Sequence, residues 1–225
     1  MKSSALAIIA TIGLTTAFGG GWTGTAIASE SISKVTGSIQ VDADTTVDRL
    51  DTVNGSIDVG VKARSGDVST VNGSIKLGDG AQVGELSTVN GSIRGGREVH
   101  AESASTVNGQ IYLDRGSQIR GDISTVNGSI GLVGTRVDGD IEMNNGDLTV
   151  GANSHVLGGI HYDKPGTQWF SFGKKAPFVV IGPAAQVDGA LVFERDVRLL
   201  VHDSARIGPV TGATVETYSG NTPPR

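Results

Sequence analysis

Cysteine is absent from the 225-residue chain, and aromatic residues are scarce. Without cysteine the protein forms no disulfide bond, zinc–thiolate site, thiol nucleophile or lipid-modified cysteine. Phe, Trp and Tyr make up 4% of the residues, whereas glycine occurs 34 times. This composition favours many tight corners around a narrow aliphatic core over a broad globular core.

Basic clusters and long internal apolar runs are also missing. The formal net charge is -5, and no segment concentrates Lys and Arg. We therefore expect no nucleic-acid partner and no attraction to an anionic membrane. After the N-terminal segment no apolar run approaches the length of a transmembrane helix, so we expect no membrane insertion of the mature chain.

The N-terminal segment has the organisation of a signal peptide. Lys2 precedes a short apolar run from Leu6 to Ala17, and Ala26, Ile27 and Ala28 form a small-x-small cleavage pattern. We predict a signal peptide at residues 1–28 and an exported protein, either periplasmic or secreted.

The tetrapeptide TVNG occurs five times at a nearly constant interval. Its asparagines are Asn54, Asn72, Asn90, Asn108 and Asn127, so the successive intervals are 18, 18, 18 and 19 residues. A constant short interval is typical of stacked repeats, because one unit cannot bury its apolar face alone. The extra residue of the longest interval falls between Ile119 and Ile123, which predicts an insertion at a corner that leaves the apolar positions intact.

Aligning the repeats places apolar residues in columns. One column holds the valines Val35, Val53, Val71, Val89, Val107 and Val126, and another holds the isoleucines Ile39, Ile57, Ile75, Ile93, Ile111 and Ile130. Aliphatic residues recur two positions after most of these isoleucines, as one face of a strand requires. We expect the valines and the glycines to point inward, with the asparagine at a corner between them.

These columns predict an all-β fold, a single-stranded parallel β-helix or β-solenoid. We expect about nine coils of about 18 residues within 29–218, one loop insertion near 165–176, and a disordered tail at 219–225. Parallel crossovers are right-handed by default, which favours a right-handed solenoid. The alternative is a left-handed hexapeptide solenoid, because the repeat length is a multiple of six.

The repeated polar residues predict structural roles first. Asparagine tolerates corner conformations, and its amide can bond to the copies above and below. We predict a structural amide ladder, with a row of ligand-binding amides as the alternative. Its members are Asn54, Asn72, Asn90, Asn108, Asn127 and Asn145.

Two further polar columns accompany the asparagines. We expect the threonines to point outward beside a serine column, as a flat grid of hydroxyls like that of an ice-binding surface. These threonines are Thr52, Thr70, Thr88, Thr106 and Thr125. Acidic residues stack at another corner, where they are either solvated or bridged by a cation; they are Asp67, Glu85, Asp122 and Asp140.

Catalytic chemistry has little support in the sequence. The four histidines, His100, His155, His161 and His202, are expected in different columns, and coils with short corners lack the long loops that build a catalytic groove. We predict no catalytic residue, no metal site and no cofactor.

One segment interrupts the regular repeat. Aligning the coils places an insertion of roughly Pro165 to Ala176 where the next asparagine corner should be. Aromatic and lysine side chains gather in and beside it, which is typical of a contact surface. The candidate binding residues are Tyr162, Lys164, Trp169, Phe170, Phe172, Lys174 and Lys175, within the segment 162–178. The alternative is a loop that covers apolar surface on the solenoid flank.

Several coils resemble those of known families. The segments GSQIRGDI at 116–123, GTRVDGDI at 134–141 and VVIGPAAQVDGAL at 179–191 resemble bactofilins, a polymer-forming cytoskeletal family. The TVNGSI units between Thr52 and Ile130 resemble the β-solenoid repeats of adhesin-type domains. The bactofilin resemblance implies a right-handed β-helix that associates end to end without a nucleotide, although bactofilins are not exported.

Together these observations lead to three functional hypotheses. The first is a non-enzymatic, exported structural or scaffolding β-solenoid that forms homo-oligomers through its ends. The second is a module that binds a cell-envelope protein or glycan, in the manner of an adhesin, through the aromatic segment or the threonine column. The third is a carbohydrate-active enzyme.

Overall fold

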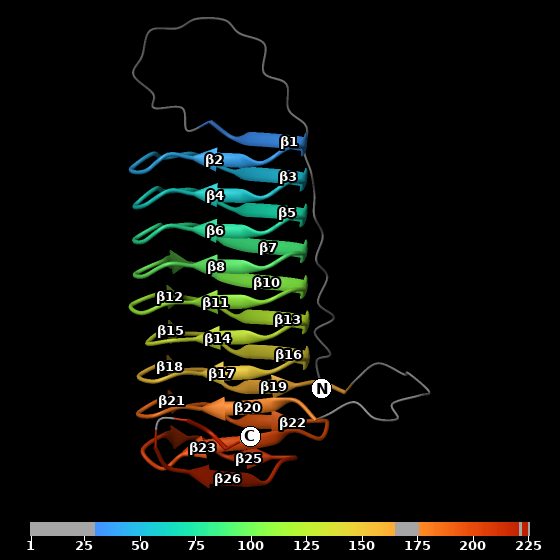
Figure 1. Ribbon diagram of the computed structural model, residues 1–225, viewed down its shortest axis with the longest axis vertical. Helices are drawn as coiled ribbons and strands as arrows, with labels where there is room; N and C mark the ends of the chain where they lie inside the picture. The colour runs from blue at the N-terminus through green and yellow to red at the C-terminus, as the bar shows by residue number, and fades with distance from the viewer. Residues whose placement is uncertain (1–29, 165–175, 221, 225) are drawn as a thin grey trace, which may run out of the picture.

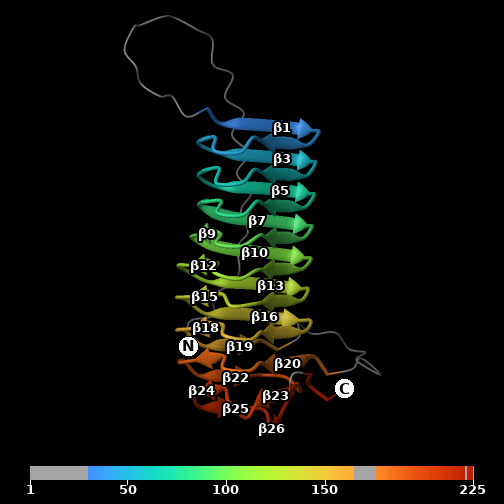
Figure 2. The ribbon, with the colours of Figure 1, turned by 60° about the vertical axis from the view of Figure 1, so that its left-hand side comes forward.

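The computed structural model describes residues 30–164, 176–220 and 222–224 (Figure 1). The regular elements of this part of the chain are β-strands, which form three parallel sheets around one long axis (Figures 1 and 2). The predicted signal peptide at 1–28 lies outside the described residues.

Sheets A and B contain ten strands each, and sheet C contains six. Sheet A consists of β1 (Ile32–Thr36), β3 (Leu50–Asn54), β5 (Val68–Asn72), β7 (Glu85–Asn90), β10 (Ser103–Asn108), β13 (Ile123–Asn127), β16 (Ile141–Asn145), β19 (Ile160–Tyr162), β22 (Leu191–Phe193) and β25 (Val210–Thr211). Sheet B consists of β2 (Ile39–Val41), β4 (Ile57–Val59), β6 (Ile75–Leu77), β8 (Ile93–Gly95), β11 (Ile111–Leu113), β14 (Ile130–Leu132), β17 (Leu148–Val150), β20 (Phe178–Ile181), β23 (Arg198–His202) and β26 (Val215–Tyr218). Sheet C consists of β9 (His100–Ala101), β12 (Gln118–Ile119), β15 (Arg136–Val137), β18 (His155–Val156), β21 (Gln186–Val187) and β24 (Arg206–Ile207).

A full coil passes once through each sheet, so the chain forms a three-sided β-solenoid, as the sequence predicts. Isolated bridges join Thr46 to Arg64, Arg64 to Gln82 and Gln82 to His100, and they extend sheet C toward the first coil. The ten-stranded sheets define ten coils, in agreement with the predicted count of about nine. Within the described chain, the last coil contributes β25 to sheet A and β26 to sheet B, and no strand to sheet C. At about 4.8 Å per coil, the described rod is about 48 Å long.

Alternation along each strand determines which residues form the core. Ile57, Ile75, Ile93 and Ile111 of sheet B have no exposed surface, and they stack directly on one another. Isoleucine suits this position because a β-branched side chain packs well on a pleated surface. The isoleucine column is therefore confirmed as the centre of the core.

The predicted orientation of the valine and threonine columns is wrong. In β7, Leu86 and Thr88 are buried, while Ser87 and Val89 point outward and are half-buried. Because Leu86 must face the core, period-two alternation places the threonine inside and the valine outside. The apolar side chain of valine suggested the opposite orientation. Threonine is tolerated inside because its buried hydroxyl is hydrogen-bonded, as in the bond from Thr88 Oγ1 to the carbonyl of Gly73.

The corner after the asparagine requires glycine for steric reasons. A Cβ atom at Gly91 would lie 1.8 Å from the carbonyl oxygen of Gly73 in the coil above, and Gly109 stands in the same relation to Gly91. A different corner, between sheets B and C, adopts the left-handed conformation in successive coils. Some of its positions are not glycine, and among them are Lys62 with φ 55° and Ala184 with φ 52°.

The longest repeat interval has the predicted structural cause. Ala101 pairs with Ile119, and Ala104 pairs with Ile123, so the corner between sheets C and A gains one residue. Arg120 is the added residue, because the amide of Gly121 continues the corner hydrogen bonds by donating to Glu102 at 2.6 Å. The apolar columns stay in register, which confirms the prediction.

Candidate functional site

The asparagine side chains form a continuous amide ladder along the corner between sheets A and B. Each Nδ2 donates to the Oδ1 of the preceding coil: Asn72 to Asn54 at 2.9 Å, Asn90 to Asn72 at 3.0 Å, Asn108 to Asn90 at 3.0 Å, Asn127 to Asn108 at 3.2 Å, and Asn145 to Asn127 at 3.2 Å. The amides thus bond to one another, which confirms the structural prediction.

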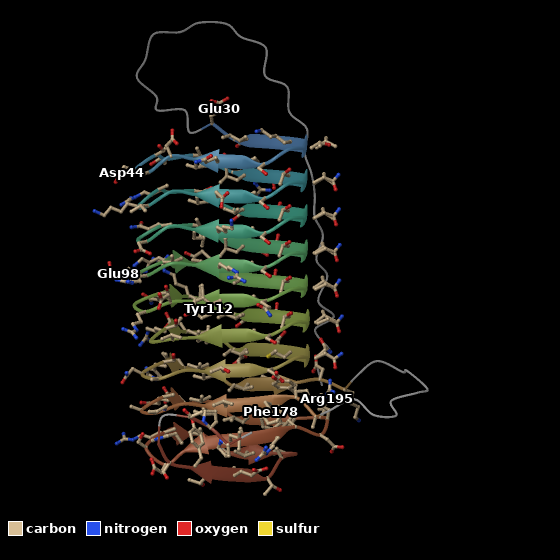
Figure 3. All side chains as sticks on the ribbon, in the orientation of Figure 1. Glu30, Asp44, Glu98, Tyr112, Phe178 and Arg195 are labelled. Carbon is tan, nitrogen blue, oxygen red and sulfur yellow. The ribbon has the colours of Figure 1, made fainter. Side chains whose placement is uncertain are left out.

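An arginine ends this ladder. The Nη1 of Arg195, in the segment between β22 and β23, donates to Oδ1 of Asn145 and to the carbonyl oxygen of Asn144. Figure 3 shows Arg195 at the lower end of the row of amide side chains. The guanidinium therefore takes the place of the next asparagine as the donor. Arg195 has no counterpart in the earlier repeats, so no periodic pattern indicates this role.

The threonine column lies behind the ladder and faces the core. Thr70 Oγ1 donates to the carbonyl of Gly55 at 3.0 Å, and Thr88 Oγ1 donates to that of Gly73 at 3.0 Å. Equivalent bonds join Thr52 to Gly37 and Thr106 to Gly91, whereas Thr125 Oγ1 has no partner in the described chain. Because these hydroxyls are buried, the predicted outward grid of threonines does not exist.

Tyr162 belongs to the core rather than to a surface site. It follows Met143 in the threonine column, packs its ring 5.6 Å from that of Phe193, and has no exposed surface. Its hydroxyl donates to the carbonyl oxygen of Gly146 at 3.1 Å, and burial raises the pKa of Tyr162. The prediction that Tyr162 belongs to a surface binding site is therefore wrong, because its side chain is buried.

The other candidate residues of the aromatic segment are only partly accounted for. The insertion connects β19 in sheet A with β20 in sheet B, so it occupies the corner that carries asparagine in earlier coils, as predicted. Lys164 is exposed. Trp169, Phe170, Phe172, Lys174 and Lys175 lie outside the described residues, and their binding role stays a prediction.

The acidic column bonds to backbone amides of neighbouring coils. Asp122 Oδ1 accepts from the amide of Asp140 at 2.8 Å, and Asp140 Oδ1 accepts from that of Gly159 at 2.6 Å. Asp67 accepts from the amide of Glu85 at 3.1 Å and pairs with Arg49 at 2.6 Å. Three of the four carboxylates in this column, those of Asp67, Asp122 and Asp140, are thus hydrogen-bonded to the next coil. The described residues contain no group of three or more side chains placed to hold a metal.

Polar side chains form one more column, on the outer face of sheet C. Its members, from the first coils to the last, are Thr46, Arg64, Gln82, His100, Gln118, Arg136, His155, Gln186 and Arg206. Two histidines thus share a column, three coils apart, which corrects the prediction that all four lie in different columns. His161 lies on sheet A beside Glu142, and His202 contacts Ser204 and Tyr218.

In the later coils this column is paired with acidic residues. Asp138 accepts hydrogen bonds from Gln118 at 3.1 Å and from Arg136 at 2.6 Å. Asp188 accepts from Gln186 at 2.5 Å and bonds His155 at 2.8 Å, and these two contacts lower the pKa of Asp188. Both carboxylates occupy the extra corner position that the chain gains at Arg120.

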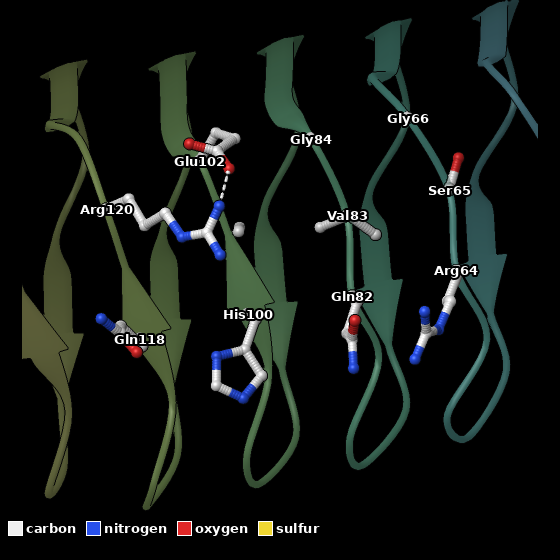
Figure 4. Close-up of a pocket in the computed structure, with 11 residues that line it drawn as sticks. Arg64, Ser65, Gly66, Gln82, Val83, Gly84, His100, Glu102, Gln118 and Arg120 are labelled. Carbon is white, nitrogen blue, oxygen red and sulfur yellow. Dashed lines mark hydrogen bonds and ion pairs between the residues drawn. The ribbon is translucent and has the colours of Figure 1, made fainter.

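The earlier coils lack that extra position, and the column borders a hollow there. Arg64, Gln82 and His100 form no side-chain hydrogen bond or ion pair within the described chain. They line a hollow of about 340 Å³ together with Gly66, Gly84, Gln118 and the ion pair of Arg120 with Glu102, whose Nη1–Oε1 distance is 2.6 Å (Figure 4). The column has no single residue type, so the repeat pattern of the sequence does not indicate this site.

Both ends of the rod present strand edges. Within the described chain, β1 and β2 of the first coil pair only with β3 and β4, and β25 and β26 of the last coil pair only with β22 and β23. Val35 at one end and Val215 at the other are exposed by 59% and 39%. These edges are the second surface with functional potential.

The fold defines the class of protein: a three-sided parallel β-solenoid. Among the described residues, no helix has the length and apolar character to cross a membrane. Neither a protein-family model, nor a curated protein, nor a solved structure matches the chain. The resemblance to bactofilins and to adhesin-type repeats therefore stays a prediction.

Proposed function

We propose that the protein is a non-enzymatic, exported scaffolding unit that associates end to end. The observation that carries this proposal is the pair of open strand edges at the ends of a rod whose strands are all parallel. An edge presents unpaired N–H and C=O groups, which template the addition of another strand. A second copy stacked head to tail would continue sheets A and B in the direction in which they already run.

The apolar columns support this arrangement. Val215 of β26 continues the column of Ile39 and Leu199, and Val210 of β25 continues that of Ile32 and Leu191. Head-to-tail stacking would place Val215 of one copy on Ile39 of the next and Val210 on Ile32. Burial of this apolar surface would stabilise the contact by roughly 25 cal/mol per Å². The proposal that the scaffold is exported rests on the segment 1–28.

Light scattering during size-exclusion chromatography of the mature chain tests the proposal. We expect the mean mass to rise with protein concentration. Val215→Glu should hold the protein as a monomer, because it places a charge beside Glu216 at the stacking edge. Val61→Glu is the matched control, since Val61 is 47% exposed at a corner within the rod, and it should associate like the unchanged chain. A monomer at every concentration, or equal behaviour of the two variants, would contradict the proposal.

A further inference from the structure

The glycine-floored hollow on sheet C has the chemistry of a binding site for an extended acidic glycan. We propose that Arg64, Gln82 and His100 bind a uronic-acid oligosaccharide that lies along the rod axis. This site is separate from the rod ends and from the aromatic segment.

The same column has acidic partners in the later coils and none in the earlier ones. Arg136 and His155 bond the carboxylates of Asp138 and Asp188. Arg64 and His100 occupy equivalent positions, but the corner beside them is one residue shorter. It supplies Gly66 beside Arg64 and Glu102 beside His100, and the carboxylate of Glu102 bonds Arg120 rather than His100. Arg64 and His100 therefore face solvent, whereas the equivalent residues of later coils, Arg136 and His155, each bond a carboxylate. A ligand carboxylate would complete the contacts that the protein supplies in the later coils.

The floor of the hollow is bare for a structural reason. A Cβ atom at Gly66 would lie 2.1 Å from the carbonyl oxygen of Asp48, and one at Gly84 would lie 2.6 Å from Oδ1 of Asp67. Gly66 therefore excludes a side chain, and Gly84 leaves the same position bare in the next coil, whereas two coils after Gly66 the position holds Glu102. The result is a trough bounded at one end by the ion pair between Arg120 and Glu102 (Figure 4).

The order of side chains along the trough favours a glycan. Arg64 and His100 flank the neutral amide of Gln82, at a spacing of about 4.8 Å per coil. Arginine donates to carboxylates with two parallel N–H groups, whereas a carboxamide both donates to and accepts from hydroxyls. A chain of uronic-acid units offers carboxylates separated by hydroxyls. The trough therefore matches it better than it matches a uniformly charged polymer.

A peptide strand fits this surface less well. Binding by strand addition needs free backbone N–H and C=O groups. At sheet C those groups bond between coils, since the amide of Gln82 donates to Ala63 at 3.0 Å and the amide of His100 donates to Ala81 at 2.9 Å. Only side chains are available to a ligand here. An acidic peptide is thus the alternative that the experiment must separate.

Calorimetric titration of the mature chain with hexagalacturonate at low salt tests the proposal. Gln82→Glu places a carboxylate between Arg64 and His100, and it imitates the way in which Asp138 and Asp188 pair with Arg136 and His155 in later coils. This substitution should weaken binding at least tenfold. Gln40→Glu makes the same charge change on the exposed face of sheet B and should leave the affinity within twofold. Thermal unfolding of both variants, monitored by circular dichroism, shows whether each is folded.

Three results would overturn the proposal. The first is no heat of binding with hexagalacturonate at millimolar concentration. The second is equal weakening by both substitutions, which would show attraction to overall charge. The third is equally tight binding of poly-glutamate, which would assign the trough to acidic peptides. Repeating the titration with Val215→Glu keeps this test separate from end-to-end association, because that variant retains the trough.

Discussion

The corner between sheets A and B is filled in two different ways along the same rod. From β3 to β10 the inward position is a threonine whose hydroxyl bonds the carbonyl of the glycine in the preceding coil. From β16 to β22 the same position is Met143, Tyr162 and Phe193, which fill the corner with apolar and aromatic volume. Tyr162 keeps the old contact in part, since its hydroxyl bonds the carbonyl of Gly146 at 3.1 Å.

This difference shows that the coil path does not depend on one corner chemistry. A repeated hydrogen bond and a packed aromatic pair both hold strands at the same spacing. The predicted insertion near 165–176 follows the threonine and asparagine columns in the chain, between β19 and β20.

Removing the aromatic filling should have the largest effect on stability. We expect Tyr162→Ala to lower the free energy of unfolding by about 3–5 kcal/mol, because it leaves a cavity in the core. Tyr162→Phe should cost about 1 kcal/mol, the loss of one hydrogen bond. Tyr112→Ala is the control, because Tyr112 is 43% exposed on sheet B and should change stability by less than about 0.5 kcal/mol. Urea unfolding measures all three, and equal effects of the two alanine variants would contradict the packing role.

The junction between the two regions should be the next most sensitive. Asn145→Ala removes one of the two acceptors of Arg195 Nη1 and should cost about 2–3 kcal/mol, because hydrogen bonds to charged groups are stronger than neutral ones. Asn90→Ala, within the ladder, removes only exposed amide bonds and should cost about 1 kcal/mol. Urea midpoints compare the two variants. A larger loss for Asn90→Ala would show that Arg195 does not terminate the ladder.

The threonine column offers a matched pair of substitutions. Thr88→Val keeps the shape but removes the donor to the carbonyl of Gly73, and should cost about 1–2 kcal/mol. Thr125→Val should be neutral or stabilising, since Thr125 Oγ1 is buried without a partner in the described chain. Thermal unfolding of the two variants gives the comparison. A similar loss at both positions would mean that the hydroxyl bond contributes nothing.

We expect the smallest effect on stability at Glu142. This residue precedes Met143 in β16, where the threonine column ends. Burial, followed by the charges of Asp122 and Asp163, raises the pKa of Glu142. A raised carboxyl pKa means that ionisation of Glu142 disfavours the folded state. The contribution of Glu142 to the free energy of unfolding therefore falls as the pH rises from the ordinary pKa through the raised one. Glu142→Gln should raise Tm by about 1 °C at neutral pH and leave it unchanged at pH 3. The opposite sign at neutral pH would contradict the assigned cause.

The repeat interval was enough to predict the solenoid, the isoleucine core, the asparagine ladder and the corner insertion at Arg120. Strand orientation was harder, because Thr88 and Val89 are adjacent and their polarity suggested the wrong one as the buried residue. The sheet C column was not visible, since its chemistry lies in differences between Arg64, Gln82 and His100 rather than in a repeated letter. The role of Arg195 depends on a contact between distant parts of the sequence.

Electron microscopy of the mature chain at increasing concentration tests the central claim most directly. Head-to-tail stacking predicts particles of constant width, with lengths at multiples of about 48 Å that shift to longer classes as concentration rises. Val215→Glu should show only the shortest class. Single rods of one length at every concentration, or aggregates that widen as they grow, would contradict an end-to-end scaffold.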